Sequence, residues 1–512
     1  MVDGFSPIRQ SVPGIASTFL ASVGERPWLG FFLFSMAHAA IWIVLPFALY
    51  PNLPLDLIEA LTYGREWQLG YDKLPPLPWW LVEIAYRTFD SDFAYYCLGQ
   101  ISVLVAFAAV WALMLRIATP AAALAAILII DGLHYFNFTA PKFNHDVIQL
   151  PFWALAGLSF HGALRSGRLG QWALLGAALG LAFWAKYFVV ILGLPLLLFM
   201  LIDRRARRCL ATPGPYVAAA IGLAIIAPHL LWLFDNHMLP LNYAAARARA
   251  VNGFFDHFTR PAFFAVAQLF WLLPAIIISL PLFRHPYERD ATTADDYDRR
   301  ILALLTFGPA VTVIAASALS GRGLVTMWGY PLWLFLGPWI VVSVSSRIDR
   351  NCLTRISGIW GAVTAIYALT FVAQYAVLPF YDHRYRAVLF PGDRVAEEIS
   401  TRFRAQTGSP LAYVVGSMWL GGNIGHYSPE HPRTLIDGDP RRAPWIDLND
   451  LATNGGVVVW TDEPYTLPEP YAAVAPDAAL QPPITLPMRR GNGEVTIGWA
   501  IIRAVRQAGM GR

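Results

Sequence analysis

The chain carries about eleven apolar runs, and most of them are long enough to cross a lipid bilayer as helices. The runs lie near residues 28–50, 97–115, 118–134, 146–164, 171–185, 187–202, 216–234, 262–283, 301–319, 324–346 and 355–379. A membrane-spanning helix needs roughly 20 predominantly apolar residues. We therefore expect an α-helical polytopic membrane protein with about eleven transmembrane helices. The runs on either side of Lys186 are interpreted as two spans joined by a tight turn.

The composition supports a membrane protein and excludes other classes. Hydrophobic residues make up 56% of the 512 residues and charged residues only 14%, whereas soluble domains carry about 25% charged residues. The net charge of +4 is too small to indicate a nucleic-acid partner. Three cysteines, Cys97, Cys209 and Cys352, have unrelated spacings, so they indicate neither a disulfide framework nor a zinc site.

Arginine placement predicts the orientation in the membrane. The loops on one side hold most of the arginines, namely Arg9, Arg26, Arg116, Arg165, Arg168, Arg204, Arg205, Arg207, Arg208, those between 284 and 300, Arg347, Arg350 and Arg355. Short loops rich in basic residues stay in the cytoplasm. The first apolar run has no small-residue cleavage site after it, so we expect an anchor and not a removed signal peptide. The N-terminus is thus predicted to be cytoplasmic.

The composition changes after Tyr381, which predicts two domains. Residues 1–381 hold the apolar runs and a charged loop at 51–96, while residues 382–512 are rich in Gly, Pro, Asp and Arg. Short β-like runs at 411–416, 456–460 and 495–502 alternate with turn-rich stretches. With an odd number of spans, we expect 382–512 to be a small extracytoplasmic α/β domain.

The loop between the first two apolar runs, PLDLIEALTYGREWQLGYDKLPPLPWW, is unusually rich in charge. Asp56 and Glu59 are spaced i, i+3 and would share one face of a helix. They could simply face water on an amphipathic interfacial helix. Alternatively, acids in apolar surroundings can take raised pKa values and act as general bases.

The chain contains three lysines and thirty-five arginines, so each lysine is a candidate functional residue. Lys73, Lys142 and Lys186 all fall in loops or turns predicted to be extracytoplasmic. An ammonium group is a compact, mobile charge that can neutralise a phosphate oxygen. This placement suits a site for a phosphorylated lipid, although chance placement and snorkelling at the interface remain the alternative.

A second polar cluster, NFTAPKFNHD, lies where the fourth apolar run begins. It places Lys142, Asn144, His145 and Asp146 together. Asp146 could merely cap the following helix. One His–Asp pair lacks the spacing of a defined metal site, so a divalent metal is possible but no cofactor is required by the pattern.

The order of these motifs resembles a known family. A first-loop acid precedes GYDKLPPLPWWL, an acid opens the fourth run before LPFWAL, and GLAFWAKYFVVIL and GRGLVTMWGYPLW follow. This order is similar to that of the GT-C membrane glycosyltransferases, in the branch of the protein O-mannosyltransferases and lipid A aminoarabinose transferases. The chain most resembles lipopolysaccharide galacturonosyltransferases of Gram-negative bacteria, and VVGSMWLGGNIGHYSPEHPRTLIDGDPRRAPWID is similar to their extracytoplasmic tail.

The resemblance implies roles for particular residues. Asp56 or Glu59 would be the base, and which of them acts stays open because the acids that are often adjacent in the family are three residues apart here. Asp146 would be the second functional acid, and Lys73 and Lys186 would contact the donor phosphate, with Tyr187 adjacent. The rarity of lysine adds Lys142 as a further candidate for phosphate binding. Asn144, His145, Arg322 and Trp328 are the further substrate-binding candidates. The family's common histidine before the double proline is Leu74 here.

The resemblance also implies an activity. We expect an inverting glycosyltransferase of the inner membrane that moves a sugar, galacturonic acid or a similar one, from a polyprenyl-phosphate donor to lipid A, lipopolysaccharide or another envelope glycolipid. The reaction would take place at the periplasmic face, where both lipid substrates arrive from the bilayer. A transporter or flippase of lipid-linked sugars is the alternative, and its mark would be charges near the bilayer midplane.

Overall fold

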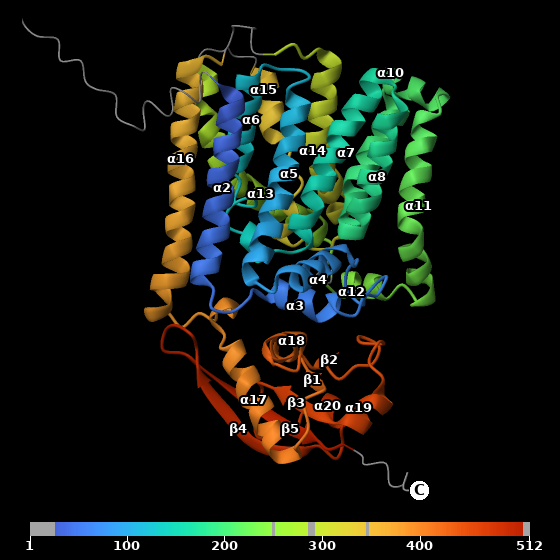
Figure 1. Cartoon of the computed structure of the whole chain (residues 1–512). Helices are drawn as coiled ribbons and strands as arrows, with labels where there is room; N and C mark the ends of the chain where they lie inside the picture. The colour runs from blue at the N-terminus through green and yellow to red at the C-terminus, as the bar shows by residue number, and fades with distance from the viewer. Residues whose placement is uncertain (1–25, 248–250, 285–291, 345–347, 505–512) are drawn as a thin grey trace, which may run out of the picture.

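A computed structural model describes residues 26–247, 251–284, 292–344 and 348–504. Figure 1 shows a bundle of roughly parallel helices and, at one end of it, a smaller unit that contains a β-sheet. Short helices lie between the two parts. Parts of the arginine pattern, Arg9 and Arg347 among them, lie outside the described residues.

Within the described ranges, seven helical segments are long and apolar enough to cross a membrane. They are Pro27–Leu49 (α2), Asp92–Met114 (α5), His145–Ser166 (α7), Gly214–Asp235 (α11), Asp256–Phe283, Asp296–Ser320 (α14) and Arg350–Phe380. The fifth segment joins Asp256–Ser279 (α13) to part of Leu280–Arg284 (η4), and the last joins Arg350–Val372 (α16) to Ala373–Val377 (η7) and Leu378–Phe380 (η8). An eighth is possible if Tyr187–Ile202 and Arg204–Ala211, which meet at a bend of 85°, count as one span. A polytopic helical protein is therefore confirmed, but a count of eleven spans is not.

Three shorter apolar helices explain most of the difference in the count. Pro120–Asp131 (α6) and Leu169–Ala185 (α8) run alongside the long helices in Figure 1 but are shorter than a typical span. The apolar run predicted at 324–346 is not one helix: it contains the 3₁₀ turn Thr326–Gly329 (η6), an irregular stretch at 330–335, and Leu336–Val344 (α15). Two separate helices meet near Lys186, because α8 ends at Ala185 and Val190–Ile202 (α9) follows a 3₁₀ turn, Tyr187–Val189 (η2), but two full spans are not confirmed there.

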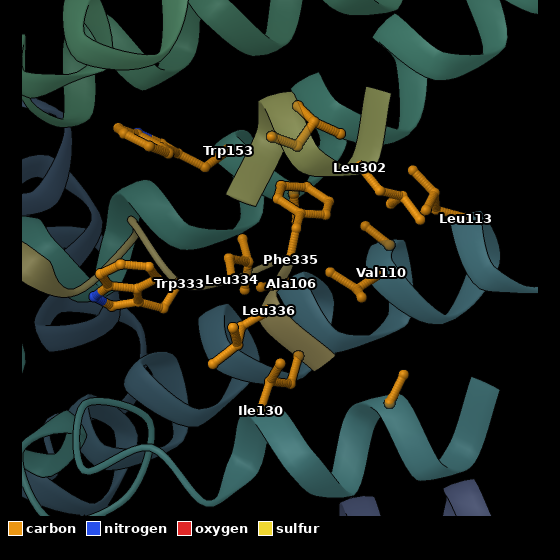
Figure 2. Close-up of a cluster of buried hydrophobic side chains, with 14 of the residues drawn as sticks. Ala106, Val110, Leu113, Ile130, Trp153, Leu302, Trp333, Leu334, Phe335 and Leu336 are labelled. Atoms are coloured by element: carbon orange, nitrogen blue, oxygen red, sulfur yellow. The ribbon is translucent and has the colours of Figure 1, made fainter. Parts of the chain in front are cut away.

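The irregular stretch 330–335 lies inside the bundle, where its side chains form part of the hydrophobic core (Figure 2). Phe335 packs directly on Gly157 of α7, where a Cβ atom would come within 2.2 Å of the ring. Thr306 of α14 donates a hydrogen bond of 3.0 Å to the Phe335 carbonyl. Non-helical backbone at this depth is tolerated because it is covered by protein and its polar groups find partners.

Short helices cover the end of the bundle that faces the sheet. They are Leu55–Gly64 (α3), Leu77–Phe89 (α4) and Leu239–Arg247 (α12) (Figure 1). α3 begins directly after Pro54, which has no backbone N–H to donate within a helix. Asp56 lies in the first turn of α3, where a negative charge is favourable. Eight consecutive residues of α3, Leu57–Gly64, are buried, so the helix is enclosed on more than one side.

The sheet has five strands in the order β2-β1-β3-β5-β4. The strands are Tyr413–Gly416 (β1), Arg433–Ile436 (β2), Gly456–Trp460 (β3), Ala479–Pro487 (β4) and Glu494–Ile502 (β5). β2, β1 and β3 are parallel, and β5 and β4 continue antiparallel. β1 and β3 are buried throughout, as expected for central strands covered on both faces.

Helices cover this sheet and connect its strands. They are Gly392–Thr407 (α17), Met418–Tyr427 (α18), Leu448–Asn454 (α19) and Glu469–Ala472 (α20). The predicted strands at 411–416, 456–460 and 495–502 are confirmed, while β2 and β4 were not predicted. The β4 edge strand contains three prolines, which hide its strand character in the sequence because proline cannot donate a hydrogen bond to a neighbouring strand.

Ion pairs and hydrogen bonds join the sheet unit to the short helices. Arg442 donates to Asp72 at 2.8 Å, and Arg433 donates to Glu66 at 2.6 Å. Both carboxylates are less than one-tenth exposed. The Tyr427 hydroxyl accepts a hydrogen bond of 3.0 Å from the Leu53 amide. α3 is thereby held between the bundle on one side and α18 on the other.

Candidate active site

The predicted first-loop acid Asp56 contacts the start of the fourth apolar run. Asn144 Nδ2 donates a hydrogen bond of 3.1 Å to Asp56 Oδ2. The other amide atom, Asn144 Oδ1, accepts from the Asp146 and Val147 amides and so caps α7. One side chain therefore both begins α7 and fixes the orientation of the acid on α3.

Glu59, one turn further along α3, forms an ion pair with Lys73. The Lys73 ammonium also lies over the ring of Tyr243 in α12, 5.4 Å from its centroid. The Glu59 side chain is almost completely buried and that of Lys73 is about one-fifth exposed. Lys73 thus closes one side of the acid cluster and connects it to α12.

Asp146 forms an ion pair with Lys186 at 2.6 Å, with both side chains about one-tenth exposed. Gln149, one turn later in α7, donates a second hydrogen bond of 2.9 Å to the same Asp146 oxygen. Lys186 has extended backbone between α8 and η2, which lets its side chain reach α7. Its ammonium also lies 5.7 Å from the centre of the Phe188 ring, on which Trp328 packs.

Lys142 has a different environment from the other two lysines. It sits at the end of a 3₁₀ turn, Ala140–Lys142 (η1), and in the part of the chain that the structure describes no carboxylate lies within ion-pair distance of its ammonium. Burial lowers the pKa of Lys142, and the negative charge of Asp56 partly offsets that effect. Among the described residues, Lys142 is therefore the lysine near Asp56 that is not held in an ion pair.

Burial and neighbouring charges shift the pKa values of the two acids of α3. Burial raises the pKa of Asp56 above its usual value, and the Asn144 hydrogen bond and the charges of Lys73 and Lys142 oppose this effect. Burial also raises the pKa of Glu59, which the charge of Lys73 opposes. Burial lowers the pKa of Lys73, but its ion pair with Glu59 outweighs burial and raises it overall.

The structure places the remaining predicted residues at different distances from this cluster. His145 Nε2 lies 3.2 Å from the Pro75 carbonyl, which connects α7 to the loop that carries Lys73. The Tyr187 hydroxyl donates to His229 Nε2 at 2.8 Å, since His229 Nδ1 donates to the Leu69 carbonyl. Tyr187 is therefore directed at α11 and not at the Asp146–Lys186 pair. Arg322 is exposed just after α14, and its carbonyl accepts from the Ser317 hydroxyl.

Sequence reasoning did not single out Gln149, Tyr243 or Tyr330. Gln149 had a detectable signal, because it follows Asp146 by three residues and shares its helix face. Tyr243 and Tyr330 come from distant parts of the chain; Tyr330 hydrogen-bonds Thr139, just before the Lys142 turn. Their positions depend on helix packing, which the local pattern does not encode.

A metal was one open possibility for this cluster. Among the described residues, no group of three or more His, Cys, Asp or Glu side chains is arranged to hold a metal ion. Instead Asp56, Glu59 and Asp146 are each engaged by an amide or an ammonium group.

The acids and lysines gather at the end of the helical bundle that faces the sheet unit, and solved structures have a similar fold. The fold is similar to that of ArnT from Cupriavidus metallidurans bound to undecaprenyl phosphate, with a TM-score of 0.60 and 15% identity, over 94% of this chain and 99% of that one. The apo structure of the same ArnT gives a TM-score of 0.59 at 16% identity, over 93% and 98%. The chain therefore has the GT-C fold of membrane glycosyltransferases.

Sequence comparison leads to the same class. Residues 73–232 match the family described as dolichyl-phosphate-mannose-protein mannosyltransferase. A stretch of 199 residues, 38% of this chain, is 29% identical to the lipopolysaccharide core galacturonosyltransferase RgtB of Rhizobium johnstonii, and it spans 39% of that relative. The resemblance to GT-C membrane glycosyltransferases expected from the motifs is confirmed.

Proposed function

We propose that this chain is an inverting glycosyltransferase that moves a sugar from a polyprenyl-phosphate donor to an envelope glycolipid. The observation that carries the proposal is the cluster of Asp56, Glu59 and Asp146 with three lysines at one end of the bundle. Acids and cations in one place are what transfer from a lipid phosphate requires, because one group must remove a proton while others stabilise a leaving phosphate.

Asp56 is the better candidate for the base. Its hydrogen-bond partner is a neutral amide, whereas the charge of Glu59 is neutralised by Lys73. Burial raises the pKa of Asp56, and a carboxylate with a raised pKa accepts a proton more readily. Asp56 would take the proton of the acceptor hydroxyl as its oxygen bonds to the anomeric carbon. The bond from that carbon to the donor phosphate breaks, and attack from the opposite face inverts the configuration.

The lysines would stabilise the phosphate as its charge develops. Lys142 has no carboxylate partner among the described residues, so its ammonium can meet a phosphate oxygen without first breaking an ion pair. Lys73 and Lys186 are held by acids and would contribute from their fixed positions. Phe188 lies beside the Lys186 ammonium and Trp328 is tilted against the Phe188 ring, and the two rings would offer aromatic surface for the donor.

The names of the relatives narrow the proposed substrates. The ArnT neighbour was solved with undecaprenyl phosphate, which supports a polyprenyl-phosphate donor here. RgtB is named as a galacturonosyltransferase of the lipopolysaccharide core, which supports galacturonic acid or a similar sugar, and lipid A or lipopolysaccharide as acceptor. We propose the same class of substrates for this chain.

We further propose the predicted domains and orientation. Residues 1–381 would form the transferase domain and 382–512 a periplasmic α/β domain, with the N-terminus in the cytoplasm of an inner-membrane protein. The arginines of Arg204–Arg207 (α10) lie at the end of the bundle opposite the sheet unit in Figure 1, as the positive-inside rule requires for this orientation.

Two experiments test this function. A deletion strain should lack one sugar in the mass profile of its lipid A and core, and the wild-type gene should restore it. Purified protein should transfer the missing sugar from a polyprenyl-phosphate donor to the acceptor lipid of the deletion strain. An unchanged glycolipid profile together with no transfer in vitro would refute the proposal.

The alternative function, transport of lipid-linked sugars, also has an observation in its favour. His38, midway along α2, lies 2.9 Å from Asp131 at the end of α6, and both side chains are almost fully buried. Ionisable groups within a membrane bundle often mark a transport path. Here Trp360 donates to Asp131 at 2.6 Å and the Asp131 carbonyl accepts from Asn137, so Asp131 is enclosed and hydrogen-bonded. Movement of a fluorescent lipid-linked sugar across proteoliposomes without acceptor would favour transport.

A further inference from the structure

A cavity of 510 Å³ lies between the short helices and the sheet unit. α3 and α4 form one wall, and α18 with the start of β2 forms the other. Its charged and aromatic lining consists of Arg65, Glu66, Glu83, Tyr86, Arg87 and Arg433. The volume lies within the range of about 300–1,000 Å³ that is usual for ligand sites.

This cavity is separate from the acid cluster, because its lining includes none of the three acids Asp56, Glu59 and Asp146. At about 100° per residue, the lining residues Leu61 and Arg65 lie roughly 140° and 180° around the helix axis from Asp56, whereas Glu59 lies only roughly 60° from it. α18 packs against α3 so closely that a Cβ on Gly422 would come within 2.5 Å of the Thr62 hydroxyl oxygen. The cavity continues this contact region outward.

The walls of the cavity are fixed by contacts among their own polar groups. Arg65 donates to the carbonyls of His431 and Pro432 at 2.8 and 3.1 Å. His431 has a positive φ of 45°, which is unusual for a residue other than glycine, and Arg65 holds the chain at this point. Arg433 pairs with Glu66 across the two walls. These groups are therefore preorganised for a ligand, which limits the entropy lost on binding.

The charge of the lining is mixed and slightly positive. Three arginines face two glutamates. Burial and the neighbouring His431 lower the pKa of His426 to about 4, so His426 is neutral near pH 7. The Glu66 and Glu83 side chains are less than one-tenth exposed, while Arg87, whose guanidinium lies 5.7 Å from the centre of the Trp67 ring, is 60% exposed. Arg87 also pairs with Glu83 at 2.6 Å, and its side chain is the most exposed of the three arginines that line the cavity.

These side chains match a saccharide better than a lipid chain. Carboxylates accept hydrogen bonds from hydroxyl groups, arginines donate to hydroxyl and carboxylate oxygens, and an aromatic ring such as that of Tyr86 can stack on a sugar. Leu61 is the one large aliphatic side chain among the lining residues of this cavity. The excess of arginine over glutamate favours a ligand that carries negative charge.

We propose that this cavity binds an acidic oligosaccharide segment of the acceptor, at a distance from the hydroxyl that is glycosylated. This inference rests on the proposed function for the identity of the ligand as acceptor. The cavity would hold the water-soluble part of a glycolipid whose reacting sugar lies at the acid cluster. It would thereby select acceptors by sugars that take no part in the chemistry.

Binding of a defined probe tests the site without reference to activity. The purified full chain in detergent is titrated by calorimetry with digalacturonate, and with lactose as the neutral disaccharide. Digalacturonate should bind and lactose should bind at least about tenfold more weakly, as expected for loss of a charge-assisted hydrogen bond. Equal binding of the two sugars, or no binding of digalacturonate, would overturn the proposal.

Variants assign the binding to this cavity. Arg87→Gln should weaken digalacturonate binding about tenfold or more. Arg441→Gln is the matched control, since Arg441 is 85% exposed and pairs with Asp439 outside the cavity. The double variant Arg433→Gln with Glu66→Gln provides a second test that leaves no buried charge unpaired. Unchanged affinity in both cavity variants would place the bound sugar elsewhere and refute the site.

Transfer kinetics separate this proposal from the proposed function. Arg87→Gln should raise KM for the full acceptor about tenfold, and should not change KM for an acceptor stripped of its acidic sugars. If the wild-type chain binds digalacturonate but transfers no sugar, the proposed transferase function is refuted, while sugar binding in the cavity is still supported. If transfer occurs and Arg87→Gln leaves KM for the full acceptor unchanged, acceptor binding in the cavity is refuted, while the transferase function is still supported.

Discussion

The acids of the site differ in the partners that hold them. Asp56 bonds to an amide, Glu59 and Asp146 to ammonium groups. Single substitutions at these positions therefore have different expected costs for activity and for stability, even though all three residues are carboxylates.

Asp56→Asn should leave the protein folded but reduce transfer about 10²–10⁴-fold, the usual cost of removing a general base. The amide keeps the shape of the side chain but cannot accept the proton. Turnover of the purified variant, with size-exclusion behaviour as the folding control, is the measurement. Near-normal turnover of Asp56→Asn with an inactive Glu59→Gln would transfer the role of base to Glu59.

Asn144→Ser should move the acid limb of the pH–rate profile to higher pH. The Asn144 hydrogen bond lowers the pKa of Asp56, so its loss raises a pKa that burial has already raised. The base works only when ionised, and kcat/KM therefore falls earlier as the pH drops. Serine is itself a good helix N-cap, so α7 should still begin correctly. A limb at the wild-type position, or one shifted to lower pH, would contradict this role for Asn144.

Lys186→Ala should weaken donor use sharply and also destabilise the protein by about 3–5 kcal/mol, because it leaves Asp146 buried and unpaired. Lys186→Arg should restore donor use only partly, since the guanidinium is planar and bulkier. The double variant Lys186→Gln with Asp146→Asn removes both charges and should regain much of the stability but not the activity. Thermal unfolding and donor-dependent kinetics separate the effects; wild-type KM for the donor in Lys186→Ala would favour a purely structural pair.

At the scale of single elements, the sequence predicted the candidate residues but not their partners. The spacing of Asp56 and Glu59 correctly placed them on a helix, and NFTAPKFNHD correctly preceded one. The ion pair of Asp146 with Lys186 joins residues 40 apart, and the bond from Asn144 to Asp56 spans 88. Such pairs are selected when helices pack, so a local pattern contains no record of them.

The irregular stretch before α15 gives a prediction for one element. Gly157→Ala should destabilise the bundle by about 1–3 kcal/mol, because the added methyl overlaps the buried Phe335 ring. Gly170→Ala in α8 is the control, since a Cβ there meets no atom within 4 Å. Thermal unfolding in one detergent compares the two. Equal unfolding temperatures would mean that the segment 330–335 moves without cost.

For the whole molecule, composition and apolar runs correctly predicted a polytopic helical protein. They did not predict the number of spans reliably. α6, α8 and α15 are apolar but short, and hydropathy alone treats an apolar buried segment as a span. The attachment of the sheet unit was not predictable either, because the Arg442–Asp72 contact joins residues 370 apart.

The orientation is tested with reporter fusions. A reporter that is active only in the periplasm should be active when fused after Arg512 and silent when fused after Arg208, because arginine-rich loops stay in the cytoplasm. A reporter active only in the cytoplasm, fused at the same two positions, is the control and should give the reverse pattern. Activity after Arg208 and silence after Arg512 would invert the arrangement and place the acid cluster at the cytoplasmic face.

The enclosure of α3 has a consequence for exchanging parts between relatives. A chimera that replaced only residues 382–512 would set a foreign helix against the native Thr62 and Ile58, where only a glycine such as Gly422 fits. It would also have to supply arginines for the buried Asp72 and Glu66. α3, which carries Asp56 and Glu59, therefore has to match both the bundle and α18. A functional chimera must transfer α3 and α4 together with the sheet unit.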